Sequence, residues 1–199
     1  MGVESISKGE ALRLTEGRDE AVSPTSIDGL YKVDMKVRVD ARGNFREAWR
    51  KEWSDKYGLP ELNPLAWNFS ETVGRGVLRG IHAEPWDKYI TIGKGEIYVA
   101  YVDLRKGPNF GQVEQFSLAE GQAVYIPQGC GNSFQVLSDW AFYTYLVTDY
   151  WQPEVNYPSV HPFDPKLGIN WPVSQEQSLL SDKDANQPFL KDVSPVEVK

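Results

Sequence analysis

Residues 74–147 contain the part of the sequence that decides the fold. Five short apolar runs follow one another there, namely GVLRGI (76–81), YITI (89–92), EIYVAYVDL (96–104), AVYIP (123–127) and AFYTYLV (141–147). Turn signals rich in Gly, Pro and Asn separate the runs, for example at 93–95, 106–109 and 120–121. Many short strands at close spacing are typical of an antiparallel sandwich or barrel, whereas a βαβ layout needs longer crossovers. We therefore predict an all-β fold.

Two further patterns lie upstream of the apolar runs. Apolar and polar residues alternate over residues 31–39, and this period of two predicts a half-buried strand. Aromatic side chains then recur at every fourth position, at Phe45, Trp49, Trp53 and Tyr57. Gly58 follows them at a position that suits the end of a helix, so we predict one short amphipathic helix that ends there.

Length and composition indicate one domain. The chain has 199 residues, of which 41% are hydrophobic and 25% charged, values that suit a globular domain with a sizeable core. Residues 1–24 are polar and charged with little periodicity, and we expect an N-terminal arm there. The folded domain is expected over 25–190, with a little helix after Ser181, and a C-terminal tail over 191–199.

Charge and cysteine content exclude several classes of protein. The net charge is −7 and no cluster of Lys or Arg occurs, so we expect no nucleic-acid partner. Since no apolar stretch is long enough to span a bilayer, we expect no membrane partner either. The N-terminal segment lacks the apolar run of a secretory signal, and the single cysteine, Cys130, excludes an internal disulfide. These features predict a cytoplasmic protein.

The sequence contains only two histidines, so a histidine mechanism has few candidates. His82 follows the first apolar run, where a histidine is more often structural than catalytic. His161 lies in a Pro-rich loop, and we expect it at the surface. A catalytic iron or manganese site needs two or three histidines and a carboxylate, and no dinucleotide-binding glycine motif occurs. We therefore predict no metal and no cofactor.

Ordered motifs over residues 28–190 carry a resemblance to a known family. The first apolar run and the histidine that follows it end in Arg79-Gly80-Ile81-His82. Further motifs lie at 42–43, 47, 88–90, 95–96, 102–105, 110–111, 126–127, 145, 148–150, 164–172 and 180–184. Together they resemble the dTDP-4-dehydrorhamnose 3,5-epimerase family.

The resemblance implies both a fold and a reaction. The fold would be a cupin-type jelly-roll β-barrel with a few short peripheral helices. The activity would be a cofactor-independent isomerase that inverts C3 and C5 of dTDP-4-keto-6-deoxy-D-glucose to give dTDP-4-keto-L-rhamnose, a step of dTDP-L-rhamnose biosynthesis. Each inversion removes a proton beside a ketone and returns one on the opposite face, which requires a base, an enolate stabiliser and an acid.

The resemblance also implies the catalytic roles. His82 would be the base, and Asp184 would orient its ring and favour the imidazolium. Lys88 would place a positive charge near the ketone oxygen; without the motif it would be interpreted as a surface lysine. Tyr145 would reprotonate the opposite face, and the alternative is a buried aromatic side chain of the barrel.

Other positions match the family's ligand contacts. Arg42 and Arg79 would bind the diphosphate, because a guanidinium matches phosphate oxygens bidentately. Further contacts are implied for Glu47, Asn68 and Lys183. Trp151 stands where the family has an aromatic residue suited to stacking on the base, although simple packing explains it nearly as well.

Two segments depart from the family pattern. Asn132 stands where the family has a second active-site histidine, and it can hold the sugar without titrating. The segment after His82 reads Ala-Glu-Pro-Trp over 83–86 and is shorter than usual. These changes leave open a C3-only epimerase, a keto-isomerase and a binding module without catalysis.

Two expectations concern assembly. Family likeness implies a homodimer in which the strand near Tyr31 crosses to the neighbouring subunit. Some proteins of this group resemble the epimerase half of a fused epimerase and reductase. The charged ending at 196–199 would suit a joint to such a reductase.

Overall fold

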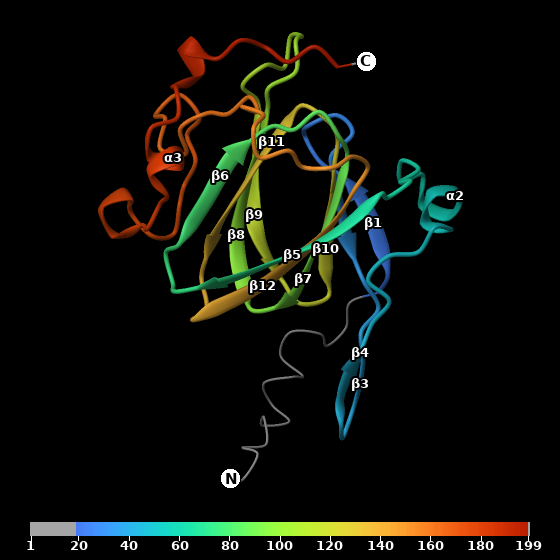
Figure 1. The fold of residues 1–199 in the computed structure, drawn as a ribbon. Helices are drawn as coiled ribbons and strands as arrows, with labels where there is room; N and C mark the ends of the chain where they lie inside the picture. Colours follow the sequence, from blue (N-terminus) through green and yellow to red (C-terminus); the bar gives the residue numbers. More distant parts are fainter. Residues whose placement is uncertain (1–18, 199) are drawn as a thin grey trace.

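The computed structural model describes residues 19–198, whose strands form two facing sheets and a separate hairpin (Figure 1). The larger sheet has the order β1-β2-β10-β7-β12-β5. Its strands are β1 Ala21–Pro24, β2 Tyr31–Asp34, β10 Gln122–Ile126, β7 Lys88–Lys94, β12 Trp140–Val147 and β5 Ala66–Val73. The smaller sheet has the order β6-β11-β8-β9, with β6 Leu78–His82, β11 Cys130–Val136, β8 Glu96–Asp103 and β9 Val113–Ala119.

Helices are few and short. They are α2 Trp53–Tyr57, α3 Asp182–Ala185 and the 3₁₀ turns η1 Gln175–Gln177 and η2 Leu190–Asp192. All pairings between the named strands of residues 19–198 are antiparallel. The structure therefore confirms the all-β, cupin-type jelly roll with short peripheral helices.

The main core lies between the two sheets. Strand β8 alternates, so Ile97, Val99 and Tyr101 face inward, and they pack in the same fully buried cluster as Ile90 and Ile92 of β7. Ala100 and Val102, which face the other side of β8, are also buried, so this strand reads as one apolar run in the sequence. Burial of such side chains supplies the main driving force for closing the two sheets on each other.

Two smaller clusters cover the outer faces of the sheets. Trp53 of α2 packs with Val33 and Tyr89 on the outer face of the larger sheet. On the smaller sheet, Ile81 and Val102 pack against the C-terminal segment, which Figure 1 shows in orange and red beside β6. The backbone of Val196 pairs with that of Leu104 at 2.7 Å, so part of the expected tail over 191–199 lies against the barrel.

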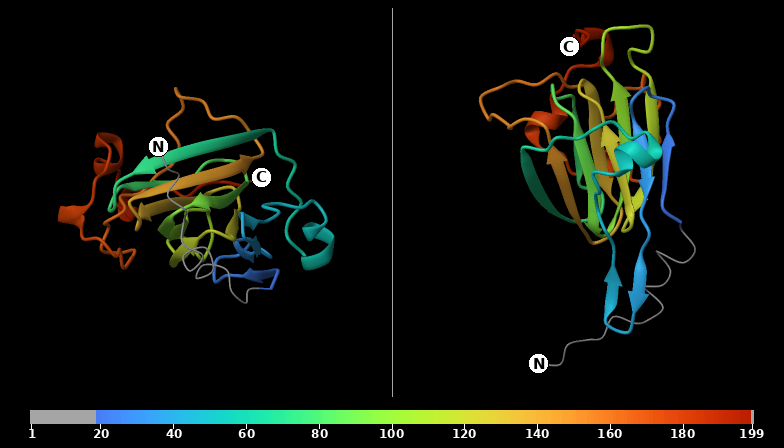
Figure 2. Two further views of the ribbon diagram at one scale, coloured as in Figure 1. Left: turned by 90° about the horizontal axis from the view of Figure 1, so that it is seen from below. Right: turned by 90° about the vertical axis from the view of Figure 1, so that its right-hand side faces the viewer.

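The expected strand over 31–39 is divided in the structure. Strand β2 ends at Asp34, and Arg38–Asp40 (β3) instead pairs with Gly43–Phe45 (β4) in a hairpin that extends away from the barrel (Figure 2). Strand β2 also has both edges paired within the chain, to β1 and β10. The expected crossing of the strand near Tyr31 to a neighbouring subunit stays a prediction. Residues 1–18 of the predicted arm lie outside the described residues, and Ala21–Pro24 forms β1.

The predicted helix over the aromatic repeat is shorter than expected. Only Trp53–Tyr57 is helical, because Phe45 is in β4 and the side chain of Arg46 donates to the carbonyls of Ile92 and Gly93. The predicted helix end is confirmed. Gly58 adopts a left-handed conformation with φ of 70°, and its N–H donates to the carbonyl of Ser54 at 3.0 Å.

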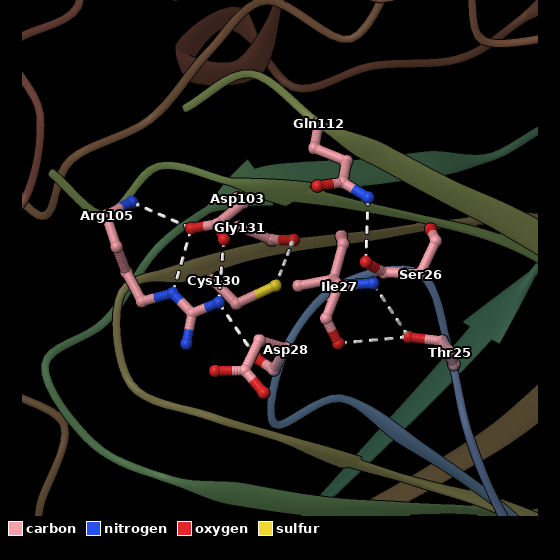
Figure 3. A network of polar contacts seen from close by, with 9 residues as sticks. All are labelled: Thr25, Ser26, Ile27, Asp28, Asp103, Arg105, Gln112, Cys130 and Gly131. Atoms are coloured by element: carbon pink, nitrogen blue, oxygen red, sulfur yellow. Dashed lines mark hydrogen bonds and ion pairs between the residues drawn. The ribbon is translucent and has the colours of Figure 1, made fainter. Parts of the chain in front are cut away.

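A polar network holds the loop before β2 against the barrel (Figure 3). Arg105 makes two side-chain hydrogen bonds to the buried carboxylate of Asp103, at 2.8 and 2.6 Å, and donates to the carbonyl of Asp28. Gln112 donates to the carbonyl of Ser26 at 2.7 Å. The hydrogen bonds with Asp103 raise the pKa of Arg105, so the guanidinium stays charged.

Replacing Arg105 with Met should destabilise the fold. Asp103 would lose the partner of a buried carboxylate, and we expect the free energy of unfolding to fall by about 2 kcal/mol. Urea denaturation measures this change. The neighbouring variant Lys106→Met serves as the control, because the Lys106 pair with Glu197 is exposed and its loss should change stability little. Equal stability of the two variants would contradict the structural role of the Arg105 network.

Candidate active site

A cavity of about 620 Å³ lies between the two sheets, a size suited to a small ligand. Strands of both sheets contribute to it, together with the segment that contains α3. The structure brings most of the predicted site residues to its lining. These are Arg79, His82, Lys88, Asn132, Tyr145, Trp151, Lys183 and Asp184.

His82 and Asp184 are paired although 102 residues separate them. The distance from His82 Nε2 to Asp184 Oδ1 is 2.7 Å. Strand β6 presents the histidine at its last residue, and α3 presents the carboxylate, whose side chain is only 7% exposed. Ser181 caps α3 by accepting from the Asp184 N–H at 3.1 Å, so the start of the helix fixes the carboxylate.

The environment of Asp184 keeps it ionised. Burial by itself would raise the pKa of Asp184, but contacts with His82, the Gly80 N–H and the Ser181 side chain outweigh it and lower the net pKa below its ordinary value. A lowered pKa means that the carboxylate loses its charge only at more acidic pH than usual. Because an ionised carboxylate only accepts hydrogen bonds, the proton of the contact belongs to His82 Nε2.

Gly80 allows β6 to lie close to β11. Its φ is +108°, and a Cβ at this position would lie 2.5 Å from the carbonyl oxygen of Asn132. Any larger residue would push the two strands apart. Gly80 therefore allows the close packing of β6 on β11 that positions His82. The same packing brings the Gly80 N–H within 3.3 Å of the Asp184 carboxylate.

A second polar group in the cavity surrounds Lys88. Its ammonium makes an ion pair with Glu84, and the Lys88 side chain is only 7% exposed. Asn132, which pairs with His82 across β11 and β6, donates its amide to the His82 carbonyl at 3.0 Å. The same amide nitrogen lies 3.4 Å from Glu84 Oε2. Lys88 is therefore a buried charged residue with a partner. The alternative interpretation as a surface lysine is wrong.

Tyr145 comes from the opposite sheet. It lies on β12, and its ring centroid is 5.5 Å from that of Tyr143, which also lines the cavity. Burial raises the pKa of the Tyr145 phenol, and the negative charge of Glu84 raises it further, against a smaller lowering effect of Arg79. The phenol therefore keeps its proton at neutral pH, as an acid must.

The exposed part of the cavity carries cations and an aromatic ring. Arg79 and Lys183 are exposed there, and Arg79 Nε donates to Thr72 Oγ1 at 3.1 Å. Trp151 is also exposed, so it is not a packed core residue. An anionic ligand with a flat ring system would meet complementary groups at these positions.

Three predicted ligand contacts do not line this cavity. Arg42 lies in the β3–β4 hairpin with its side chain 89% exposed and paired with Asp40. Glu47 pairs with Arg50 at 3.1 Å. Asn68 lies on β5 opposite Tyr145 but outside the lining.

Other residues of the cavity were missed by the sequence analysis. Glu84 lay in a segment interpreted only as a departure from the family pattern. Its spacing of two from His82 was a usable signal, because residues two apart in an extended chain face the same side. Ser70 carried no such signal, and Ser181 lay within the motif at 180–184 without a role of its own. His161 was expected at the surface and is half-buried, with Nδ1 accepting from the Phe163 N–H at 3.1 Å.

Within residues 19–198, no group of three or more His, Cys, Asp or Glu side chains is arranged to hold a metal ion. In the same part of the chain, no helix has the length and apolar character needed to cross a bilayer.

The fold and the cavity define the class of protein. It is a cupin-type jelly roll that carries groups for acid and base chemistry between its two sheets. A family model described as dTDP-4-dehydrorhamnose 3,5-epimerase matches residues 24–192. The chain belongs to the dTDP-4-dehydrorhamnose 3,5-epimerase family, and its class of enzyme is that of the isomerases.

Individual relatives agree with this assignment. A Streptococcus pyogenes protein named RmlC homolog is 41% identical over 179 residues, which cover 87% of this chain and 90% of that protein. The dTDP-4-dehydrorhamnose 3-epimerase of Streptomyces niveus is 35% identical and covers 84% of this chain and 82% of that protein. The solved structure of RmlC from Streptococcus suis in complex with dTDP-D-xylose matches with a TM-score of 0.87 and 40% identity, covering 92% of this chain and 97% of that chain.

Proposed function

We propose that this protein inverts C3 and C5 of dTDP-4-keto-6-deoxy-D-glucose to give dTDP-4-keto-L-rhamnose, without a cofactor. One observation carries the proposal. The His82–Asp184 pair and Tyr145 line the same cavity from opposite sheets, His82 from β6 and Tyr145 from β12. A base and an acid on opposite sides of a bound sugar are what inversion at carbon requires.

His82 removes the proton through Nδ1. Asp184 holds the Nε2–H, so the lone pair of the neutral ring is on Nδ1. When Nδ1 takes a proton from the carbon beside the ketone, the ionised Asp184 stabilises the imidazolium that forms. The lowered pKa of Asp184 supports this role, because the carboxylate stays charged at neutral pH.

Lys88 and Tyr145 complete the reaction. Removal of the proton moves negative charge onto the ketone oxygen, where the largely buried ammonium of Lys88 stabilises it. Tyr145 then donates its phenolic proton to the other face of the same carbon. Its raised pKa keeps that proton available.

The remaining lining residues suit the rest of the substrate. Arg79 and Lys183 place positive charge where a diphosphate would bind, and Trp151 offers an exposed ring on which a base can stack.

The reaction leaves a ketone at C4, so a separate or fused reductase is the enzyme class that would consume the product. The single cysteine, which cannot form an internal disulfide, supports a reducing, cytoplasmic setting for this sequence of reactions.

Product analysis tests the proposed reaction. The enzyme is incubated with dTDP-4-keto-6-deoxy-D-glucose, and ¹H NMR follows the sugar signals. We expect coupling constants of the L-rhamno configuration, which shows inversion at both carbons. A moved carbonyl would identify a keto-isomerase, and unchanged substrate despite dTDP binding would identify a module without catalysis. Either result would overturn the proposal.

A C3-only epimerase is the second candidate. Two observations favour it, the replacement of the usual histidine by Asn132 and the Streptomyces niveus relative that is named a 3-epimerase. The same NMR experiment separates the candidates, because inversion at C3 alone keeps the coupling at C5 of the D-series sugar.

We further propose that the protein is a homodimer formed through the outer face of β5. Trp67 and Phe69 are 62% and 55% exposed there, and their rings lie 4.8 Å apart. A hollow of about 500 Å³ lies beside Trp67, next to Phe45 of the hairpin. A contiguous exposed aromatic surface of this kind is typical of a protein contact. Arg42 and Glu47 do not line the cavity of their own chain. Their predicted role as ligand contacts therefore requires that they reach the cavity of the second subunit.

The Phe69→Asp variant tests this interface. A charge on the aromatic face should raise the dimer dissociation constant at least tenfold, as for a central interface residue. Light scattering after gel filtration should give twice the 22.5 kDa chain mass for the wild type and the single mass for the variant. Val155→Asp is the control, since Val155 is an exposed apolar residue of a loop elsewhere. A monomeric wild type would contradict the interface.

A further inference from the structure

Glu84 occupies the catalytic cavity although no role is assigned to it by the proposed reaction. Its carboxylate lines the cavity, is mostly buried and contacts two other residues of the lining. One is Lys88, whose ammonium it pairs with, and the other is Asn132, whose amide nitrogen lies 3.4 Å from Oε2. Glu84 and Asn132 lie in the two segments where the sequence departs from the family pattern, and the structure places them in contact.

The contacts with Glu84 leave some hydrogen-bond donors and acceptors of Asn132 and Lys88 available to a ligand. Asn132 has two amide hydrogens, and its nitrogen contacts the His82 carbonyl and Glu84, so only its Oδ1 remains to accept from a ligand. Lys88 has three N–H donors, and the contact with Glu84 uses one. Two donors therefore remain for the substrate, with their directions limited by the first.

Burial makes the direction of the Lys88 ammonium important. Lysine has a flexible four-carbon side chain, and an ammonium without a fixed partner samples several positions. At 7% exposure Lys88 has little water to pair with, so Glu84 is the group that decides where the charge lies. A shift of about 1 Å in a group that stabilises the transition state can cost about 100-fold in rate.

We infer that Glu84 is a positioning residue that acts through Lys88, and that Asn132 holds Glu84 in the required orientation. This inference rests on the proposed function, in which Lys88 stabilises the negative charge on the ketone oxygen. It assigns a shared purpose to the two departures from the family pattern. Asn132 supplies an uncharged donor to the carboxylate, and the carboxylate in turn directs the lysine.

A double-mutant cycle on the full chain tests the inference, with turnover of dTDP-4-keto-6-deoxy-D-glucose as the readout. Glu84→Gln keeps the size of the side chain and removes its charge, and we expect kcat to fall about 10- to 100-fold while KM changes less than about threefold. Lys88→Met should lower kcat by about 100- to 1000-fold. Adding Glu84→Gln to Lys88→Met should lower kcat less than about twofold further. Glu96→Gln, at the exposed start of β8, is the matched control.

The results distinguish a failure of the role of Glu84 from a failure of the proposed function. A wild-type kcat for Glu84→Gln, or multiplied effects in the double variant, would overturn the role of Glu84 and leave the proposed function intact. A wild-type kcat for Lys88→Met would overturn the role of Lys88 and with it that of Glu84, whereas only a wild type that fails to turn over the substrate would overturn the proposed function itself. Asn132→Ala gives a second test if Glu84→Gln does not fold. It should lower kcat about 3- to 10-fold in the wild type but not in the Lys88→Met background, and equal effects in both would contradict the inference.

Discussion

The His82→Asn variant is expected to turn over the substrate about 10³- to 10⁴-fold more slowly than the wild type. Solvent exchange at C3 and C5 should slow by the same factor. Asn cannot accept a proton from carbon at neutral pH, so the step that begins each inversion has no base. The contact with Asp184 cannot compensate, because the pair works by holding the Nε2–H and so leaving the lone pair of the ring on Nδ1. The loss should therefore appear in kcat and only weakly in substrate binding.

NMR in deuterated water measures both losses in one sample. The His161→Asn variant is the matched control, because it removes the other histidine, which does not line the cavity. Binding of dTDP shows whether each variant is folded. Full activity of His82→Asn would refute its assignment as the base, and inactivity of both variants would show that loss of a histidine destabilises the fold.

Tyr145→Phe is expected to separate exchange from inversion. Without the phenol, the opposite face of the carbon receives no proton, and we expect formation of the epimer to fall about 10²- to 10⁴-fold. His82 can still remove a proton and return a deuteron on its own side. Exchange at C3 should therefore continue with retention of configuration, a result that a merely structural role of the tyrosine would not produce.

The measurement compares deuterium content and configuration at C3 by NMR. Tyr98→Phe is the control, since its hydroxyl bonds to Gln115 on the outer side of the smaller sheet. Because burial raises the pKa of Tyr145, the wild type should not lose activity through ionisation of this residue below about pH 10. Equal losses of exchange and inversion in Tyr145→Phe would contradict its assignment as the opposite acid.

The barrel was predictable because its signal is local. Several barrel strands are short apolar runs between turn signals, as in residues 96–104, and such a run is visible without knowledge of its partners. The division of the expected strand at Asp34 was not predictable from the alternation over residues 31–39. The alternation continues past the point where the chain leaves the sheet, and only the pairing of β3 with β4 ends it.

The candidate site was predictable only through resemblance. No local pattern connects His82 with Asp184, since β6 and α3 meet through the packing of the C-terminal segment on the smaller sheet. Glu84 was missed for the opposite reason. It departs from the family pattern, so resemblance offered no role for it, although its spacing from His82 placed it on the same side of the chain.

The most direct measurement is deuterium uptake at C3 of dTDP-4-keto-6-deoxy-D-glucose by the wild-type enzyme in deuterated water, followed by ¹H NMR. If a histidine in this cavity removes the hydrogen beside the ketone, the C3 signal disappears at the rate of turnover or faster. A C3 signal that persists while the protein binds dTDP would contradict proton abstraction by this site.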